Sequence, residues 1–204
     1  MNYHLLQYIK APRTSSQKII KHVRKLVTEP HRIRAYFFYL THPQYTLFTP
    51  NTTRYLHTYL KPGMKVFEWG AGRSTVFFAK HDVELTTIED NAKWHQKVSQ
   101  KLSMQGFRRF EMKLVTNEQK YIHAIDTYQD NYFDVVAVDG RERSDCLLTA
   151  IPKVKKNGLL ILDDSQRERY LPVVNELNRR GWKVTHYPYG FNRTSVWTKP
   201  AAAG

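Results

Sequence analysis

From about residue 65 to residue 198, short apolar segments alternate with segments of helical periodicity. Residues 133–138 are almost wholly apolar, which is typical of a strand that is buried on both faces of a sheet. Strands that alternate with helices predict a parallel sheet covered on both faces, and two final strands without a helix between them predict an antiparallel hairpin. We therefore expect an α/β fold with a doubly wound, mostly parallel, seven-stranded sheet. The predicted strands are 65–69, 84–88, 110–115, 133–138, 159–162, 183–187 and 194–198, and the predicted helices between them are 73–81, 92–105, 118–125, 144–151 and 166–180.

The first 62 residues are expected to form a separate, basic helical cap. One helical pattern starts near Ser16 and ends before Pro30, and two more cover residues 32–41 and 52–60. Residues 1–61 contain ten Lys or Arg residues and one acid, Glu29. Such a charge attracts nucleic acid, an acidic membrane surface or an acidic substrate, although a solvated basic face is an equally good interpretation.

The composition is that of one globular domain, which we expect to cover residues 63–200. The chain has 204 residues, of which 41% are hydrophobic, and no apolar run is long enough to span a membrane. Cys146 is the only cysteine, so no internal disulfide can form. That fits a reducing compartment, and together with an N-terminus that lacks a secretory pattern it predicts a cytoplasmic protein. The final AAAG, residues 201–204, is expected to be a cloning remnant outside the fold.

The strongest motif is a glycine-containing turn between the first predicted strand and the helix that follows it. Gly70 and Gly72 allow a sharp bend and the close approach of a ligand. The N-terminus of the next helix offers free N–H groups, and Ser74 offers a hydroxyl. A dinucleotide-binding fingerprint has a third glycine where this chain has Thr75, and Glu68 precedes the turn. The turn therefore disfavours a nicotinamide dinucleotide.

A carboxylate follows the second predicted strand at the position where a cofactor site would need it. Glu89 stands 17 residues after Gly72 and can accept hydrogen bonds from a ribose diol. Asp90, the next residue, is more suitable as the cap of the following helix.

Taken in order, these features resemble the class I S-adenosylmethionine-dependent methyltransferases over residues 63–198. The features are the turn with Glu68, Gly70 and Gly72, the acid Glu89, and five strand–helix units that end in a hairpin. The resemblance implies that residues 68–74 hold the methionine part of the cofactor, that Glu89 holds the ribose, and that the adenine lies near Asn117. In this superfamily, N-terminal helices often cover the site and help to select the substrate.

Three further carboxylates end the fourth and fifth predicted strands, where adjacent strand ends meet at one crevice. They are Asp139, Asp163 and Asp164. Oxygen ligands of this kind suit Mg²⁺, and the set resembles the metal site of cation-dependent O-methyltransferases of the catechol and macrocin type. The lysine of the catechol type is replaced here by Glu142, and the histidine of the macrocin type by Gly140. The alternative is that Asp139 contacts the cofactor amine or acts as a base without a metal.

Several residues after the same strands are candidates for contact with an acidic substrate. Arg141 and Arg143 carry guanidinium groups that recognise carboxylate or phosphate, as do Arg167 and Arg169. Tyr170 and residues 191–193 are expected at the substrate mouth, whereas Trp182 and Trp197 are expected in the core.

The sequence therefore predicts a methyltransferase that uses S-adenosylmethionine, with or without Mg²⁺, to methylate an oxygen of a small or acidic hydroxylated substrate. Asp139 is expected nearest to the reaction, as a base or a metal ligand. Two alternatives stay open at this point: an RNA or DNA methyltransferase that uses the basic N-terminal region, and a non-catalytic binding module. The oligomeric state is not indicated by the sequence.

Overall fold

The computed structural model of the chain describes residues 37, 38, 41, 42, 48–190 and 192–201. The chain divides into two compact units, Met1–His42 and Pro43–Gly204. In the first unit, Phe37, Phe38 and Thr41 are helical, and the Thr41 hydroxyl donates to the Phe37 carbonyl at 2.8 Å. The rest of the two helices predicted before residue 42 lies outside the described residues, as does Phe191.

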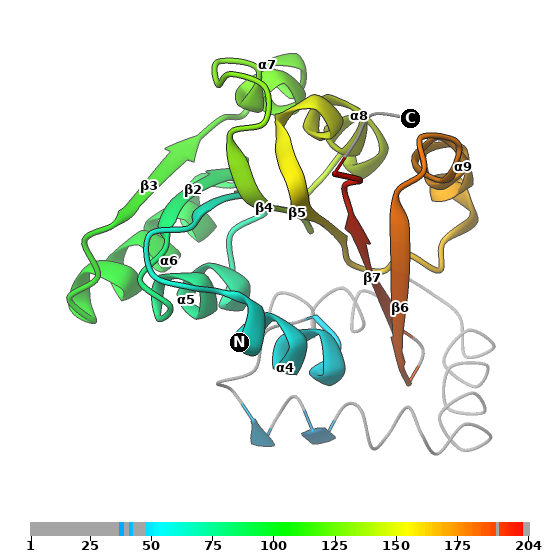
Figure 1. Cartoon of the computed structure of the whole chain (residues 1–204). Helices are drawn as coiled ribbons and strands as arrows, with labels where there is room; N and C mark the ends of the chain where they lie inside the picture. Colours follow the sequence, from blue (N-terminus) through cyan, green and yellow to red (C-terminus); the bar gives the residue numbers. More distant parts are fainter. Residues whose placement is uncertain (1–36, 39–40, 43–47, 191, 202–204) are drawn as a thin grey trace, which may run out of the picture. The chain divides into compact units, whose positions relative to one another are not determined.

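Seven strands form one sheet in the order β3-β2-β1-β4-β5-β7-β6 (Figure 1). Strands β1 to β5 pair in parallel, and β7 pairs in antiparallel fashion with both β5 and β6. The predicted parallel sheet with a closing antiparallel hairpin is confirmed. The strands are β1 Lys65–Trp69, β2 Glu84–Glu89, β3 Phe110–Leu114, β4 Phe133–Val138, β5 Val154–Leu162, β6 Lys183–Tyr189 and β7 Asn192–Thr198.

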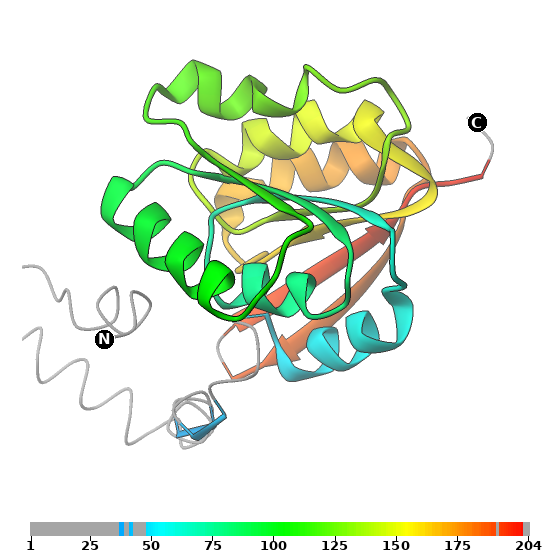
Figure 2. The same ribbon diagram turned by 90° about the vertical axis from the view of Figure 1, so that its left-hand side faces the viewer.

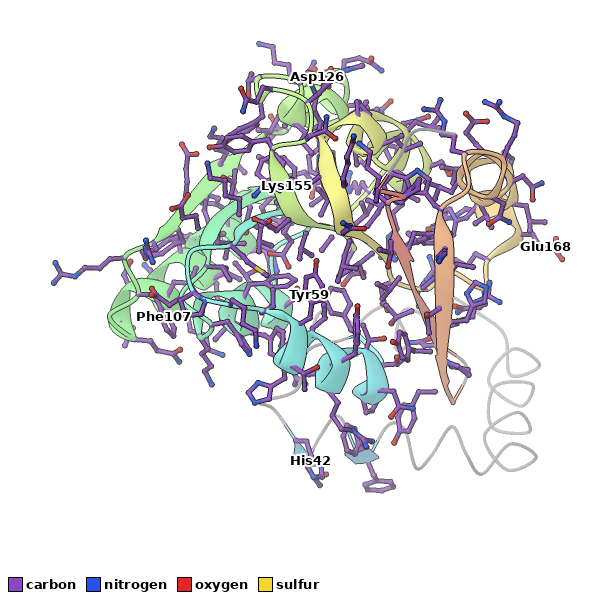
Figure 3. All side chains as sticks on the ribbon, in the orientation of Figure 1. His42, Tyr59, Phe107, Asp126, Lys155 and Glu168 are labelled. Atoms are coloured by element: carbon purple, nitrogen blue, oxygen red, sulfur yellow. The ribbon has the colours of Figure 1, made fainter. Side chains whose placement is uncertain are left out.

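Helices cover both faces of this sheet in two layers (Figure 2). One layer consists of α4 (Pro50–Tyr59), α5 (Arg73–Ala79) and α6 (Ala92–Met104). The other consists of α7 (Glu118–Ile122), α8 (Arg143–Lys153) and α9 (Leu171–Arg179), with the short 3₁₀ helices η1 (His123–Ile125) and η2 (Glu168–Tyr170). Among the residues that Figure 3 labels, Phe107 follows α6 in the first layer and Asp126 follows η1 in the second. No described helix combines the length and the apolar character needed to cross a membrane.

The alternation of side chains along the central strands builds a separate core on each face. Trp69 and Val138 belong to the cluster beneath α7, α8 and α9, whereas Val66 and Ala137 belong to the cluster beneath α4, α5 and α6. All six residues of β4 except one are buried, which is why its sequence is nearly continuous in apolar residues. Trp182 and Trp197 are buried as predicted.

The strand register brings the ends of four parallel strands to the same level. Trp69 of β1 pairs with Ile88 of β2 and with Val138 of β4, and Val138 pairs with Leu162 of β5. The next residues in the chain are therefore gathered at one edge of the sheet, the carboxyl edge. They are Gly70, Glu89, Asp139 and Asp163.

Two elements start five residues away from their predicted first residues. Strand β5 starts at Val154 and not at residue 159, because Val154 already pairs with Phe133 of β4. A register shift separates this pair from the next one, Val135 with Leu159. Helix α9 starts at Leu171 and not at residue 166, because the loop after β5 is tied to β7. In that loop the Ser165 amide donates to the Arg193 carbonyl at 2.8 Å.

Candidate functional site

The glycine turn after β1 is in direct contact with the loop after β4. Gly70 has a φ of 93°, and a Cβ on it would lie 2.6 Å from the Gly140 amide nitrogen. A Cβ on Gly140 would in turn lie 1.9 Å from the Tyr121 hydroxyl. Only glycine fits at these two positions, so the ends of the two strands approach each other as closely as backbones can.

Gly72, two residues further along, has open space beside it. Its φ of −178° is extended backbone that any residue can adopt. Apart from the two chain neighbours of Gly72, no atom of the described residues lies within 4 Å of the place where a Cβ would be. The glycine is therefore not explained by packing within the chain, and it leaves room for a ligand to approach the turn.

Glu68 lies buried beneath the turn and braces it. Its Oε2 accepts hydrogen bonds from the hydroxyls of Thr75 at 2.6 Å and Thr87 at 3.0 Å, while the Thr75 oxygen accepts from the Gly72 amide at 2.7 Å. These bonds link β1, β2 and the start of α5. Burial raises the pKa of Glu68 to about 7, although the neighbouring hydroxyls act in the opposite direction.

The role of Thr75 was not predicted, although the sequence contained a signal for it. Thr75 stands where the dinucleotide fingerprint has its third glycine, and its hydroxyl joins the turn to Glu68. Trp94, in the first turn of α6, is a second residue of the site that was not predicted. Its indole N–H donates to the Ala71 carbonyl. The predicted cofactor residue Ser74 is buried in the first turn of α5.

Glu89 is buried at the end of β2, with its carboxylate held by backbone N–H groups. The Ala71 amide donates to Oε2 at 2.9 Å, and the amides of Asp90 and Asn91 donate to Oε1 at 3.1 and 2.9 Å. Since a carboxylate offers about four acceptor sites, about one remains for a ligand hydroxyl. Burial raises the pKa of Glu89 to about 7, against the effect of the backbone N–H groups.

Asp90 does not cap the next helix, and this part of the sequence interpretation was wrong. Asn91 is the N-cap of α6, and its side chain accepts from the Trp94 amide at 3.0 Å. Asp90 instead pairs with Arg141, with 2.6 Å between Oδ2 and Nε. The ion pair joins the loops that follow β2 and β4, the two neighbours of β1.

Arg143 is the organising residue of the acidic group at the ends of β4 and β5. Its side chain is 8% exposed, and its Nη2 lies 2.8 Å from Oδ1 of Asp139. Its Nη1 donates to the Asp163 carbonyl at 2.7 Å and lies 3.7 Å from Oδ2 of Asp164. The charges of the three aspartates raise the pKa of Arg143, although its burial acts in the opposite direction, so the guanidinium stays positive.

The other partners of these carboxylates are also protein groups. The Thr194 hydroxyl donates to Oδ1 of Asp163 at 2.7 Å, and Arg167 pairs with Asp164. Burial, followed by the nearby Asp139 charge, raises the pKa of Asp163 well above its usual value. Among the described residues, no group of three or more His, Cys, Asp or Glu side chains is placed to hold a metal ion. The structure gives no support to Mg²⁺ at Asp139, Asp163 and Asp164, because Arg143 supplies the compensating positive charge.

The predicted substrate residues separate into one exposed and two buried side chains. Arg141 is 71% exposed at the carboxyl edge. Arg143 is buried among the aspartates, and Tyr170 is 2% exposed within the core, so neither is at a substrate mouth. Asn117, predicted near the adenine, is exposed and caps α7 by accepting from the Lys120 amide at 3.0 Å.

No protein-family model and no curated protein sequence matches the chain. Solved structures do match it. An rRNA methylase from Streptococcus thermophilus superposes with a TM-score of 0.62 at 16% identity, over 76% of this chain and 99% of that one. An S-adenosylmethionine-dependent O-methyltransferase from Thermotoga maritima has a TM-score of 0.59 at 11% identity, over 81% of this chain and 71% of that one. A methyltransferase-like protein from Silicibacter pomeroyi has a TM-score of 0.57 at 21% identity, over 78% and 90%.

The chain has the methyltransferase fold. The cofactor that this fold implies is S-adenosylmethionine, and the residues at the carboxyl edge fit it. The open space beside Gly72 admits a ligand at the turn, and the carboxylate of Glu89 retains an acceptor site. In a doubly wound sheet, the ligand site lies at the carboxyl ends of the strands where the strand order reverses, which here is between β1 and β4.

Proposed function

We propose that the protein is an S-adenosylmethionine-dependent methyltransferase that methylates an oxygen atom of a hydroxylated substrate. The observation that carries the proposal is the carboxyl edge between β1 and β4. At this edge, the glycine turn with open space beside Gly72 follows β1, Glu89 ends β2, and Asp139 follows β4, and these three strands are neighbours in the sheet.

On this proposal, the chain's own residues hold and align the two reactants. Gly70 and Gly72 let the backbone approach the methionine part of the cofactor, and Glu89 accepts a hydrogen bond from the ribose. Asn117 is the candidate for contact with the adenine. S-adenosylmethionine, when bound, supplies an electrophilic methyl group on a sulfonium sulfur. Most of the rate enhancement then comes from alignment and from the exclusion of water.

Asp139 is the candidate for contact with the acceptor hydroxyl. Its side chain is 9% exposed and is held by Arg143, so its position is well defined. A strong base is not needed, because an oxygen that gains a methyl group becomes strongly acidic and releases its proton readily to a neighbouring acceptor.

The acceptor is proposed to be a small or acidic hydroxylated compound. Arg141 supports an acidic acceptor. It stands two residues after Asp139, its guanidinium is exposed, and its one ion pair among the described residues is with Asp90. When a carboxylate or phosphate of the substrate arrives, Arg141 can turn from Asp90 to the ligand.

Two measurements test the proposal. Calorimetry should detect binding of S-adenosylhomocysteine and no binding of NAD. A screen of hydroxylated metabolites, acidic sugars and RNA with radiolabelled cofactor should then identify a labelled product. Tight NAD binding without a response to S-adenosylhomocysteine would contradict the cofactor, and binding of S-adenosylhomocysteine without any turnover would favour a non-catalytic module.

The Asp139→Asn variant tests the mechanism with the product in hand. Turnover should fall about 10²-fold or more while the affinity for S-adenosylhomocysteine changes little. Asp145→Asn, an exposed change on α8, is the control. Since Arg143 compensates the carboxylates, chelation of divalent ions should leave turnover unchanged, and a loss that Mg²⁺ restores would revive the metal alternative.

A further inference from the structure

The two helical layers of the sheet differ in charge. Helices α4, α5 and α6 contain no Asp or Glu residue. On the opposite face, each of the three α-helices contains one acid, Glu118 in α7, Asp145 in α8 and Glu176 in α9. Acidic residues therefore offset part of the positive charge in the layer of α7, α8 and α9, and none of it in the layer of α4, α5 and α6. These last three helices lie together on one side of the sheet in Figure 2.

The unbalanced charge is concentrated in a lysine row on α6. Lys93, Lys97 and Lys101 are four residues apart, so they follow one side of the helix at intervals of about 6 Å. All three are exposed, whereas Val98 and Leu102 face the core. None of the three lysines forms an ion pair with any residue in the described part of the chain.

Nothing nearby in the chain neutralises the row. The twenty residues 91–110 contain no acid, and Arg108 and Arg109 extend the positive stretch beyond the helix. Lysines four residues apart repel each other and destabilise a helix. A polyanion that lies along α6 would remove this repulsion.

The lysine row begins at the proposed site. Helix α6 begins three residues after Glu89, and its first turn contacts the glycine turn through the indole of Trp94. The row then runs away from the carboxyl edge toward Phe107, which Figure 3 labels just beyond the helix. A strand bound along the row would have one end beside the site.

We propose that the exposed face of α6 is a binding surface for a nucleic-acid strand. The regular spacing of the lysines matches a ligand with regularly spaced phosphates. A second copy of the chain is a poor partner for this face, since each copy has a net charge of +14. A lipid bilayer is also a poor partner, because Met104 is the one large hydrophobic side chain that α6 exposes and the helix has no apolar face left to insert.

The proposal goes beyond methyl transfer and does not depend on it, so binding is measured without the cofactor. Fluorescence anisotropy with the full chain and a labelled single-stranded RNA of about 20 nucleotides gives the affinity over a range of salt concentrations. The test variant is Lys93→Gln/Lys97→Gln/Lys101→Gln. The control is Lys120→Gln/Lys156→Gln/Lys183→Gln, which removes the same charge from exposed lysines of α7, β5 and β6. Melting temperatures verify that both variants fold.

The α6 variant should lose about tenfold or more in affinity at low salt, and its salt dependence should correspond to about two or three fewer phosphate contacts. The control should change affinity less than about threefold. Equal losses in the two variants would show that net charge alone attracts RNA and would overturn the proposal. Absence of binding would also overturn it, as would tighter, α6-dependent binding to vesicles with anionic lipids than to RNA.

Discussion

The two edges of the sheet differ in how deeply their charged side chains are buried. At the amino edge, where the parallel strands begin, ion pairs lie near water, such as Arg109 with Asp82, whose side chains are 49% and 62% exposed. At the carboxyl edge, the side chains of Arg143 and Asp164 are only 8% and 3% exposed. The buried carboxylic acids of the described chain, Glu68, Glu89, Asp163 and Asp164, all lie at or directly below the carboxyl edge.

The comparison shows that the cavity and the buried charged residues lie at opposite edges of the sheet. A cavity of about 280 Å³ opens at the amino edge, between residues that start their strands, such as Lys65, Glu84 and Phe110. It contains no buried charged group. Burying a carboxylate destabilises a fold unless it is paired and hydrogen-bonded. A chain that retains several of them at one edge does so where function requires them, so we assign the site to the carboxyl edge and not to the cavity.

The largest contrast between the edges is expected at Arg143. Replacing it with Gln removes the positive charge shared by Asp139 and Asp164 and should lower the free energy of unfolding by about 3–5 kcal/mol. Arg109→Gln at the amino edge should cost no more than about 1 kcal/mol. Urea unfolding measures both, and equal effects would remove the energetic distinction between the two edges.

A smaller effect is expected at the end of β2. Glu89→Ala should weaken S-adenosylhomocysteine binding by about 1–3 kcal/mol, because a buried acceptor for a ribose hydroxyl is lost. Asp90→Ala should cost much less, because its carboxylate pairs with an exposed arginine. Calorimetry on the two variants decides, and a larger loss for Asp90→Ala would mean that the wrong carboxylate has been assigned to the cofactor.

An effect of similar size is expected in the pH dependence of stability that Glu68 confers. Its pKa is raised to about 7 in the fold from an ordinary value of 4.5, so the folded state binds the proton more tightly than the unfolded state. This contribution to stability is complete below pH 4.5 and is lost as the pH rises through about 7. Between pH 5 and pH 8, the stability of Glu68→Gln relative to the wild type should therefore rise by about 2–3 kcal/mol. A stability difference that is constant with pH would contradict the raised pKa.

Much of the fold was predictable because each strand carries its own signal. Strands β1 and β4 begin and end at the predicted residues, and their apolar side chains fill both cores. The first half of β5 was missed because Lys155, Lys156 and Asn157 are polar, and because the pair of Val154 with Phe133 of β4, which starts the strand ahead of a register shift, is a tertiary effect. For the same reason, the loop that delays α9 could not be foreseen from helical periodicity.

The sequence predicted where the residues of the site lie in the chain better than it predicted which residues they contact. The sequence placed Glu89 and Asp139 after the correct strands, because strand ends are local features. It did not indicate which acidic and basic side chains form ion pairs with each other. Arg143 was expected to face a substrate, and only the start of α8 shows that its side chain turns inward to Asp139. Tyr170 was misplaced for a similar reason, since its position depends on the path of the loop after β5.

The central claim, that the cofactor lies against the glycine turn at the carboxyl edge, is tested most directly by Gly72→Ala. Beyond its two chain neighbours, the added methyl group meets no atom of the described residues within 4 Å, and the backbone there is extended. The variant should therefore fold with a loss of at most about 1 kcal/mol from the helix N-cap. It would nevertheless occupy the space beside the turn. Calorimetry with S-adenosylhomocysteine should therefore show binding to the wild type and at least tenfold weaker binding to the folded variant. Equal affinity in the two proteins would show that the cofactor does not bind against this turn.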